Sequence, residues 1–323
     1  MSTGAGAGAT AGPAGPAVGV TRGALVAELA AVVGAPHEAR FIVDEALGLG
    51  VVLGQPGVPS GPLDDDVVAA ARAMAQRRAA GEPLQYVFGH WPFRSLDLLV
   101  DPRVLIPRPE TEEVVEVALR EARRLAAEGE GEGRGGHGGL VVVDAGTGSG
   151  AIALALAVEL GPAVVREVWA TDSSPDALAV AEANLARVRA AHRGPSPFPS
   201  VSLAEGSWLE PLPARLRGAV SLVVSNPPYV CEAEWGGLDA EVRAEPRRAL
   251  VAGPAGDGTP GLADVEAVLV QGAEWLGRPG TVVIELAPHQ GEPAKTLARQ
   301  LGYREVEVLP DLARRPRALV ARR

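Results

Sequence analysis

From Pro107 onward, short apolar segments alternate with longer segments of helical periodicity, and this alternation restricts the fold more than any other feature of the chain. Strands that alternate with helices are typical of a parallel sheet covered by helices on both faces. The last two apolar segments are joined only by "PDLARRPR", which is too short for a helical crossover, so we expect them to pair antiparallel. The sequence therefore predicts an α/β domain with a seven-stranded sheet whose last strand is antiparallel. The predicted strands are 140–145, 167–172, 201–205, 219–225, 281–286, 305–309 and 318–322.

The segment before this region has the apolar spacing of a small helical domain. Two stretches carry apolar side chains at helical spacing, which predicts two amphipathic helices. A third helix is expected to begin at the acidic run Asp64 to Asp66 and to extend through Met74 toward Arg78, because carboxylates are favourable at the positive end of a helix dipole. The apolar positions are Leu25, Leu29 and Val32 in the first stretch and Phe41, Ile42 and Leu47 in the second.

Changes in composition divide the chain into four parts. The first residues are rich in Gly, Ala and Pro, a composition typical of disorder. The β-forming stretch "EPLQYVFGHWPFRSLDLLVD" contains turn residues and predicts a hairpin, with an ordinary linker as the alternative. Flexible loops are expected at 128–139 and 192–200. The four predicted parts are a disordered tail at 1–20, a helical domain at 21–81, a β-hairpin linker at 82–103 and the α/β domain at 104–323.

Composition also narrows the classes of function. The 323 residues carry a formal net charge of −10, which argues against a broad phosphate-binding face, because nonspecific nucleic-acid affinity depends on clustered Lys and Arg. A single cysteine, Cys231, excludes an internal disulfide framework, and the five histidines show no metal-ligand spacing. No apolar run reaches the length of a membrane span, and the N-terminus lacks the pattern of a signal peptide. We expect a cytoplasmic protein with no bound metal and no membrane partner.

A glycine-rich turn follows the first predicted strand, in "VVVDAGTGSGAIALALA". Gly146, Gly148 and Gly150 let the backbone approach a ligand closely, and the free amides at the start of the next helix favour an anionic or carboxylate group. Asp172, at the end of the second strand, is well placed to accept hydrogen bonds from a ribose diol. Two alternatives stay open. A similar turn occurs in nicotinamide-dependent dehydrogenases, and Asp172 could instead cap the helix that begins at Pro175.

The fourth predicted strand ends at "SNPPY", where two consecutive prolines impose a rigid turn at the carboxyl edge of the sheet. A planar NH2 group is a poor nucleophile because its lone pair is delocalised. The Asn226 side-chain oxygen and the Pro227 carbonyl oxygen are predicted to accept its two hydrogens and to favour the pyramidal nitrogen that develops during attack. The Tyr229 ring would pack over the planar group. A plain strand-terminating turn is the alternative.

Several motifs in a fixed order resemble those of one enzyme family. The chain contains, in this order, "GEPLQYVFGHWPF", "LIPRPETEEVVE", "DAGTGSGAIALALA", "SNPPYV" and "EPRRALVAGPAGDG". The tetrad after the fourth strand is similar to that of class I S-adenosylmethionine-dependent amino-methyltransferases, and the ordered set resembles the bacterial release factor glutamine N5-methyltransferases. The resemblance implies a Rossmann-like class I methyltransferase sheet, S-adenosylmethionine as the cofactor, and methylation of the glutamine in the GGQ motif of peptide chain release factors.

By matching motif, the resemblance also implies roles for individual residues. Asp172 would hold the cofactor ribose, Trp208 would lie near the adenine, and Asn226 would touch both cofactor and substrate. Ser207 and Ala287 depart from the family pattern, which usually has Asp and Gly there. Gly146, Thr147, Gly148, Ser149 and Gly150 would hold the methionine moiety, and Asn226, Pro227, Pro228 and Tyr229 would hold the substrate glutamine, with catalysis assigned to Asn226, Pro227 and Tyr229.

Residues flanking these motifs have two readings each. Those in "IPRPETEEVVE" either border the cofactor pocket or start a helix, and those in "AEPRRAL" either shape the substrate mouth or end a loop. Glu285 ends an apolar strand and is one candidate for a place behind the site. No base accompanies Cys231, so we expect no nucleophilic role for it. The residues with two readings are Arg108, Glu110, Thr111, Glu245 and Pro246.

Three rival functions stay open at this point. A DNA or RNA amino-methyltransferase acting on adenine N6 or guanine N2 would use the same turn, although the acidic balance and the lack of a recognisable nucleic-acid module disfavour it. A nicotinamide-dependent dehydrogenase would leave "NPPY" without a purpose, and the intact tetrad disfavours a binding module that has lost catalysis. We expect the N-terminal helices to dock the release factor, because one glutamine side chain offers too little surface for protein-level specificity. No direct nucleic-acid partner is expected.

Overall fold

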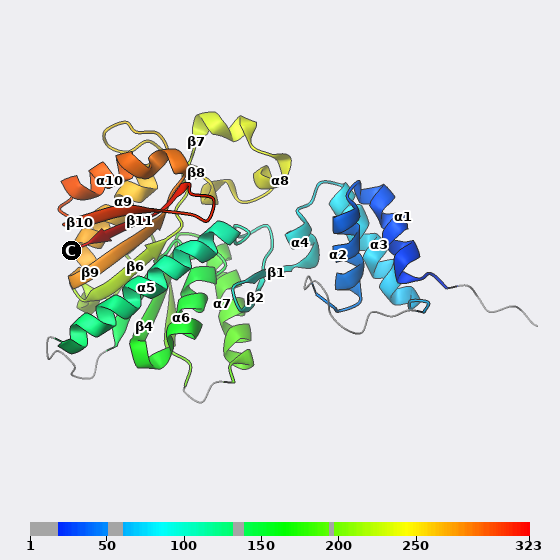
Figure 1. Cartoon of the computed structure of the whole chain (residues 1–323), viewed down its shortest axis with the longest axis horizontal. Coiled ribbons are helices and arrows are strands. Elements are labelled where there is room, and N and C mark those ends of the chain that lie inside the picture. Colours follow the sequence, from blue (N-terminus) through cyan, green and yellow to red (C-terminus); the bar gives the residue numbers. More distant parts are fainter. Residues whose placement is uncertain (1–18, 51–60, 132–138, 194–196) are drawn as a thin grey trace, which may run out of the picture. The chain divides into compact units, whose positions relative to one another are not determined.

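The computed structural model describes residues 19–50, 61–131, 139–193 and 197–323. The chain separates into two compact units, Met1–Phe88 and Gly89–Arg323 (Figure 1). Apart from Gly19 and Val20, the predicted disordered tail lies outside the described residues, as do the central residues of both predicted loops. No helix in the described ranges is both long enough and apolar enough to span a membrane.

The described residues of the smaller unit form four helices around an apolar core. Thr21 caps the first helix, where its hydroxyl accepts a hydrogen bond from a first-turn amide at 3.3 Å. Leu25, Leu29 and Ile42 are buried in the core, as their spacing predicts. Val32, which continues the same apolar spacing, is 46% exposed and lies on the surface. The helices are α1 Arg22–Val33, α2 Pro36–Ala46, α3 Asp65–Ala79 and α4 Leu84–Phe88.

The predicted linker at 82–103 divides between the two units. Its first part forms α4, and Leu84 in that helix is buried in the helical core, so the smaller unit extends beyond the predicted boundary. An antiparallel hairpin of β1 His90–Phe93 and β2 Leu96–Leu99 follows. Phe93 is buried in a core of the larger unit. The boundary differs from the predicted one because α4 is only five residues long and its sequence "LQYVF" is rich in β-formers.

A seven-stranded sheet forms the centre of the larger unit (Figure 1). The strand order is β10-β11-β9-β6-β3-β4-β5. β11 runs antiparallel to both of its neighbours, and the other paired strands are parallel. The prediction of a class I methyltransferase sheet with an antiparallel last strand is therefore confirmed. The strands are β3 Leu140–Ala145, β4 Val165–Asp172, β5 Ser200–Glu205, β6 Val220–Ser225, β9 Leu276–Glu285, β10 Glu305–Pro310 and β11 Pro316–Arg322.

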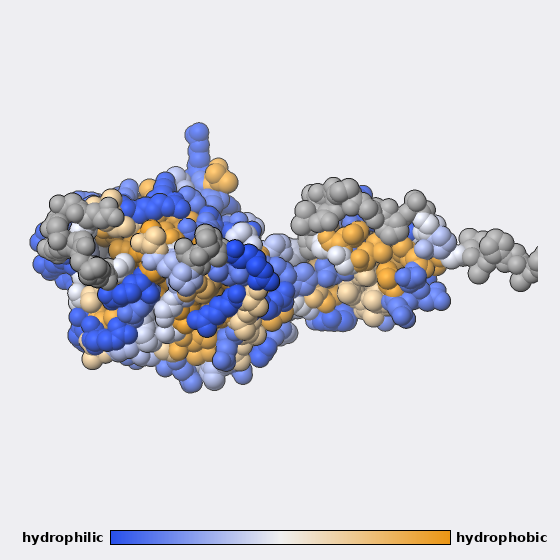
Figure 2. All heavy atoms as spheres, turned by 90° about the horizontal axis from the view of Figure 1, so that it is seen from below, coloured by the Kyte–Doolittle hydropathy of each residue, from blue (hydrophilic) through white to orange (hydrophobic). Residues whose placement is uncertain are grey.

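Helices cover both faces of this sheet. Val142 contributes to the apolar cluster under α5, α6 and α7, whereas Val141 and Val143 contribute to the cluster under α9 and α10, because successive side chains of a strand point to opposite faces. Figure 2 shows hydrophilic side chains over much of the larger unit on the face drawn. α5 includes residues 128–131, where a loop was predicted. The helices are α5 Pro109–Gly131, α6 Ala151–Val164, α7 Pro175–Ala191, α9 Ala263–Trp275 and α10 Gly291–Gln300.

Short elements connect the larger ones. β7 Val230–Cys231 and β8 Val251–Ala252 form a small parallel pair after β6. The remaining elements are η1 Ala214–Leu216, η2 Glu232–Gly237, α8 Ala240–Arg243, η3 Arg247–Ala249 and η4 Pro288–Gln290.

The carboxyl ends of β3, β4 and β6 meet at one edge of the sheet. β4 and β5 continue from β3 in one direction, and β6 and β9 continue in the other, so the strand order reverses at β3. Open α/β sheets bind their ligands in the crevice at such a reversal. The glycine turn, Asp172 and the "NPPY" tetrad all follow strands that end there.

Candidate active site

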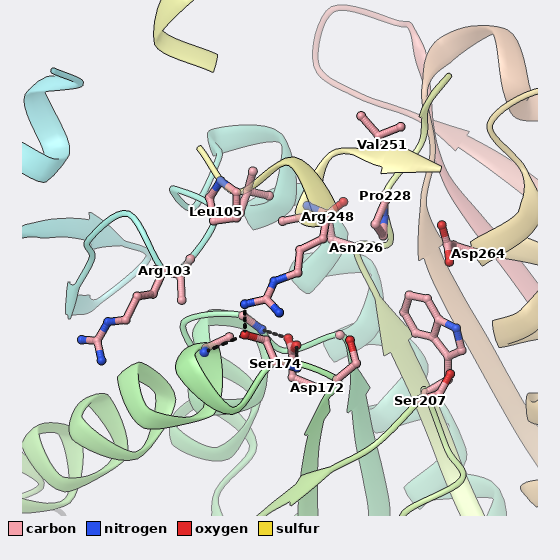
Figure 3. A pocket seen from close by; sticks show the side chains of 18 residues that line it. Arg103, Leu105, Asp172, Ser174, Ser207, Asn226, Pro228, Arg248, Val251 and Asp264 are labelled. Carbon is pink, nitrogen blue, oxygen red and sulfur yellow. Dashed lines mark hydrogen bonds between the residues drawn. The ribbon is translucent and has the colours of Figure 1, made fainter. Parts of the chain in front are cut away.

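A cleft of about 320 Å³ lies at this edge of the sheet (Figure 3). The predicted residues that line it are Gly146, Gly148, Asp172, Ser207, Trp208, Asn226, Pro228 and Pro246. Side chains that sequence reasoning did not select also line it, among them Arg103, Leu105, Arg248, Val251 and Asp264. Other predicted residues lie behind or beside the cleft: Thr147, Ser149, Gly150 and Pro227 are buried, and Tyr229 borders a neighbouring depression with Leu238 and His289.

The glycine turn between β3 and α6 brings its backbone to the cleft. Gly146, Gly148 and Gly150 have φ angles of 78°, 55° and 85°, in the region that disfavours a side chain. The Gly146 and Thr147 amides both donate to the Thr171 carbonyl oxygen, at 2.9 and 2.8 Å. The Gly148 and Gly150 amides also donate within the protein. The turn therefore offers close approach to a ligand, and most of its amides are already satisfied.

Asp172 connects the turn to the next helix. Its Oδ2 accepts from the Gly148 amide at 2.9 Å, and its Oδ1 accepts from the Ser174 amide at 2.9 Å. The Ser174 hydroxyl accepts from the Ala177 amide at 3.1 Å, so Ser174 is the residue that caps α7. The alternative reading of Asp172 as the helix cap is therefore wrong. Each carboxylate oxygen can accept more than one hydrogen bond, so Asp172 can still accept from a ligand in the cleft.

Asp144 is a buried carboxylic acid beneath the turn that sequence reasoning missed. Its Oδ2 accepts from the Thr147 hydroxyl at 2.6 Å and from the Ala153 amide at 3.0 Å. The second bond occupies one amide at the start of α6, the Ala153 amide, so this amide is not free for an anionic ligand. Burial raises the pKa of Asp144 to about 7. The available signal was a charged residue inside the apolar run "VVVDA".

Trp208 forms one wall of the cleft. A β-carbon on Gly146 would lie 3.0 Å from Cζ3 of the indole, so only glycine fits against this ring without displacement. Ser207 precedes the indole on the exposed rim. Asp264, at the start of α9, also lines the cleft, and burial raises the pKa of its carboxyl group. Trp208 therefore lines the cleft, and its contact with the adenine stays a prediction.

The turn after β6 is held on both sides. The Ser225 hydroxyl donates to the Ala145 carbonyl oxygen at 2.6 Å, which joins the ends of β6 and β3. The Tyr229 amide donates to the Leu250 carbonyl oxygen at 3.2 Å, and the Gln290 amide Nε2 donates to the Tyr229 carbonyl oxygen at 3.3 Å. Burial raises the pKa of the Tyr229 hydroxyl to about 12. Tyr229 is therefore neutral near pH 7.

The Asn226 side chain has a buried support. Its Nδ2 donates to Thr111 Oγ1 at 3.1 Å, and Thr111 Oγ1 donates to Glu285 Oε2 at 2.7 Å. Thr111 lies in the first turn of α5, in agreement with its helix-start reading, and it contacts the cleft residue Asn226 without lining the cleft itself. Burial raises the pKa of Glu285 to about 7. Glu285 lies behind the site, as predicted.

The segment after α8 bridges the cleft. Glu245 is buried, accepts a hydrogen bond from the Ile106 amide at 2.9 Å and forms an ion pair with Arg108. Burial raises the pKa of Glu245. The Arg248 guanidinium donates to the Ser174 hydroxyl on the opposite wall (Figure 3). These contacts favour the reading in which this segment shapes the mouth of the cleft.

Two other side-chain predictions concern chemistry outside the cleft. Cys231 is partly exposed and is a free thiol. Within the described residues, no group of three or more His, Cys, Asp or Glu side chains has an arrangement that could hold a metal ion.

Comparison with known proteins reveals the family. Residues 24–89 match the family model described as the PrmC N-terminal domain. The chain is 40% identical over 313 residues to the release factor glutamine methyltransferase of Moorella thermoacetica, and the match covers 93% of this chain and 96% of that protein. The chain belongs to the release factor glutamine methyltransferase family. Two further release factor glutamine methyltransferases are each 37% identical to the chain. For the one from Deinococcus radiodurans, the match covers 88% of this chain and 90% of that protein. For the one from Bordetella pertussis, it covers 90% of this chain and 96% of that protein.

Membership in the release factor glutamine methyltransferase family confirms the resemblance found in the sequence. The chain is therefore a methyltransferase, which removes the dehydrogenase reading of the glycine turn. Sequence reasoning missed Asp144, Arg248 and Asp264 because their places beneath or beside the cleft depend on how the chain folds. For Arg248 and Asp264 we find no sequence signal that separates them from ordinary surface charges.

Proposed function

We propose that this enzyme transfers the methyl group of S-adenosylmethionine to the side-chain amide nitrogen of the glutamine in the GGQ motif of peptide chain release factors. The observation that carries the proposal is the position of Asn226. Its amide lines the same cleft as Asp172 and Gly146, and its Nδ2 is held by Thr111. A group that recognises a substrate NH2 is thus beside a site suited to a nucleoside cofactor.

The cleft fits S-adenosylmethionine in several respects. The missing side chain of Gly146 lets the Trp208 ring pack against the turn as a flat wall of the cleft, and Asp172 offers carboxylate oxygens to a ribose diol. The role of Gly146 to Gly150 toward the methionine moiety stays a proposal, since it rests on backbone approach. When bound, S-adenosylmethionine supplies an electrophilic methyl group on a positively charged sulfur.

The residues of the turn after β6 would activate the substrate nitrogen by position. The Asn226 Oδ1 and the Pro227 carbonyl oxygen would accept the two amide hydrogens, which favours a pyramidal nitrogen with an available lone pair. Pro228 keeps the turn rigid, and the Tyr229 ring would pack over the flat amide. The nitrogen becomes much more acidic once it has bonded to the methyl group, so the site needs no strong base. The neutral Tyr229 hydroxyl is consistent with that.

A nucleic-acid amino-methyltransferase is the second candidate, because adenine N6 and guanine N2 present the same planar NH2. The observation that disfavours it is the net charge of −10, which opposes the phosphate backbone. We therefore expect no direct nucleic-acid partner, and we expect the enzyme to act in the cytoplasm, where release factors function.

We further propose that the smaller unit recognises the release factor outside the GGQ loop. This unit has a core of its own, so its surface can serve recognition without contributing to the cleft. Val32 is 46% exposed, and Figure 2 shows apolar side chains on the surface of this unit. Exposed apolar side chains are suited to contact with a protein partner.

The test is methyl transfer from labelled S-adenosylmethionine to a purified release factor. The same factor with the GGQ glutamine changed to alanine is the matched control, and duplex DNA and RNA are the competing acceptors. We expect label on the intact factor alone. Label on nucleic acid alone would replace the proposal with the second candidate, and equal label on the alanine variant would show that another residue of the factor is the acceptor.

A further inference from the structure

Three polar side chains from distant parts of the chain form a buried series that ends on the proposed catalytic amide. Glu285 ends β9, Thr111 lies in the first turn of α5, and Asn226 follows β6. Thr111 and Glu285 are separated by 174 residues, and Asn226 and Thr111 by 115. Thr111 is 4% exposed and Glu285 is 1% exposed. Only Asn226 reaches the cleft.

The direction of the hydrogen bonds follows from the chemistry of the three groups. An ionised carboxylate only accepts, so the Thr111 hydroxyl must donate its single hydrogen to Glu285. Thr111 can then only accept from Asn226, and the side of the amide that can donate is Nδ2. The remaining amide atom, Oδ1, is thereby directed away from Thr111 and is available to a ligand in the cleft.

This direction matters because the two orientations of an asparagine amide have almost the same shape. Rotation by half a turn would exchange oxygen and NH2 at no steric cost. With Oδ1 toward the cleft, Asn226 accepts a hydrogen from a substrate NH2. With Nδ2 toward the cleft, two donors would face each other and the substrate would lose its acceptor.

We propose that Glu285 and Thr111 are positioning residues that set the orientation of the Asn226 amide, so that its oxygen faces the substrate NH2. The proposal rests on the proposed function only in naming that NH2 as the glutamine amide. Neither residue touches the substrate, and both act through Asn226.

The surroundings of Glu285 make its charge state decisive. Arg317 of β11 lies near its other oxygen, with 4.0 Å between Nη1 and Oε1, and Arg108, Glu110 and Tyr229 contribute to the local field. Burial raises the pKa of Glu285 to about 7 despite the nearby cations. A protonated Glu285 can donate to Thr111, which frees the hydroxyl hydrogen to bond an inverted Asn226 amide. Loss of a proton from Glu285 therefore favours the productive orientation.

The Glu285→Gln variant tests the direction of the series with nearly unchanged shape. Arg317 carries only donors, so the new amide is expected to turn its oxygen toward Arg317 and its NH2 toward Thr111. Thr111 would then accept from that NH2 and donate to Asn226, which inverts the Asn226 amide. We expect kcat for the release factor to fall on the order of 10- to 100-fold, while the Kd for S-adenosylmethionine stays within about 3-fold.

Two threonine variants complete the set. Thr111→Val removes the hydroxyl and should lower kcat to a similar extent, whereas Thr111→Ser keeps the hydroxyl and should retain kcat within about 3-fold. Thr281→Val is the matched control, because Thr281 is also buried and also donates a hydrogen bond to a glutamate, Glu121, away from the cleft. Its kcat should equal that of the wild type once folding is verified by melting temperature.

The pH dependence supplies a readout that a purely structural role would not change. The wild-type kcat should fall as pH decreases through about 7, and this acidic limb should be absent in Glu285→Gln. Wild-type kcat in Thr111→Val, or an intact acidic limb in Glu285→Gln, would overturn the proposal. If Thr111→Val does not fold, Thr111→Ser and Glu285→Gln still decide the matter.

The orientation itself can be followed without activity. In 15N-labelled protein, the Asn226 side-chain NH2 should be protected from hydrogen exchange in the wild type and in Thr111→Ser, and exposed in Glu285→Gln and Thr111→Val. Identical protection in all four proteins would also overturn the proposal. A wild-type enzyme that fails to label the release factor would instead overturn the proposed function, which keeps the two failures separate.

Discussion

The indole of Trp208 lies 3.0 Å from the point that a β-carbon on Gly146 would occupy. This distance is shorter than most real β-carbon contacts, and the φ of 78° at Gly146 also disfavours any side chain. The turn and the cleft wall are therefore matched to each other. A change at either residue should alter the wall of the cleft that a ligand would contact.

Gly146→Ala should weaken S-adenosylmethionine binding on the order of 10-fold and destabilise the fold by about 1–2 kcal/mol, because the ring must move and the backbone is strained. Calorimetric titration and denaturant unfolding measure the two effects. Gly302→Ala is the control for strain alone, since Gly302 has a φ of 88° with no atom within 4 Å of the added carbon. Equal cofactor affinity in both variants would contradict the role of the contact with Trp208.

Asn226→Ala should lower kcat on the order of 100-fold or more while the Kd for S-adenosylmethionine changes by less than about 3-fold. The physical reason is that the amide oxygen is proposed to meet the substrate NH2 as it becomes pyramidal, so its energy is realised mainly during transfer. Single-turnover kinetics with the release factor and titration with the cofactor separate the two constants. Equal loss of both would assign Asn226 to cofactor binding.

Asp172→Asn should change the Kd for S-adenosylmethionine much more than kcat, the opposite of Asn226→Ala. The variant has one side-chain oxygen in place of two. It therefore cannot accept hydrogen bonds from the Gly148 amide, the Ser174 amide and a ribose at the same time. We expect the Kd for S-adenosylmethionine to rise at least about 10-fold and kcat at saturating cofactor to change much less. A fall in kcat with unchanged Kd would argue against ribose binding at this carboxylate.

Asp144→Asn should make the stability of the enzyme less sensitive to pH. The folded-state pKa of about 7 lies above the usual value, so the folded protein binds this proton more tightly than the unfolded chain. Stability is therefore highest below the unfolded-state pKa and falls as pH rises from about 4 to about 7. Over this pH range, the free energy of unfolding should fall on the order of 1–3 kcal/mol less in the variant than in the wild type. Denaturant unfolding at several pH values measures it, and an unchanged slope would contradict the assignment.

Removal of residues 1–88 should raise the KM for the release factor at least about 10-fold and leave cofactor affinity unchanged. The cut follows Phe88, because a cut near Gly81 would leave the buried Leu84 of the smaller unit without its core. A short peptide with the GGQ sequence is the control substrate, and its KM should be the same for both enzymes. Normal methylation of the intact factor by the truncated enzyme would rule out a docking role.

Much of the fold was accessible from the sequence because it depends on local patterns. The seven strands were predicted from apolar segments of strand length, and the antiparallel end from a connection too short for a helix. The errors occurred where local patterns conflict with packing. Val32 continues an apolar spacing but lies outside the core, and the β-forming sequence of α4 forms a helix because its side chains complete that core.

In the cleft, too, some features follow from local sequence and others only from packing. The sequence by itself determined which residues could meet a cofactor and a planar NH2, because a positive φ at Gly146 and the rigid turn at Asn226 are encoded within a few residues. Only the tertiary structure decided the direction in which the Asn226 amide points. That direction depends on Thr111 and Glu285, which are far away along the chain and meet Asn226 only because the order of the strands brings α5, β6 and β9 together. Hydrogen-bond direction is a property of neighbours in space, and no local pattern in the sequence carries it.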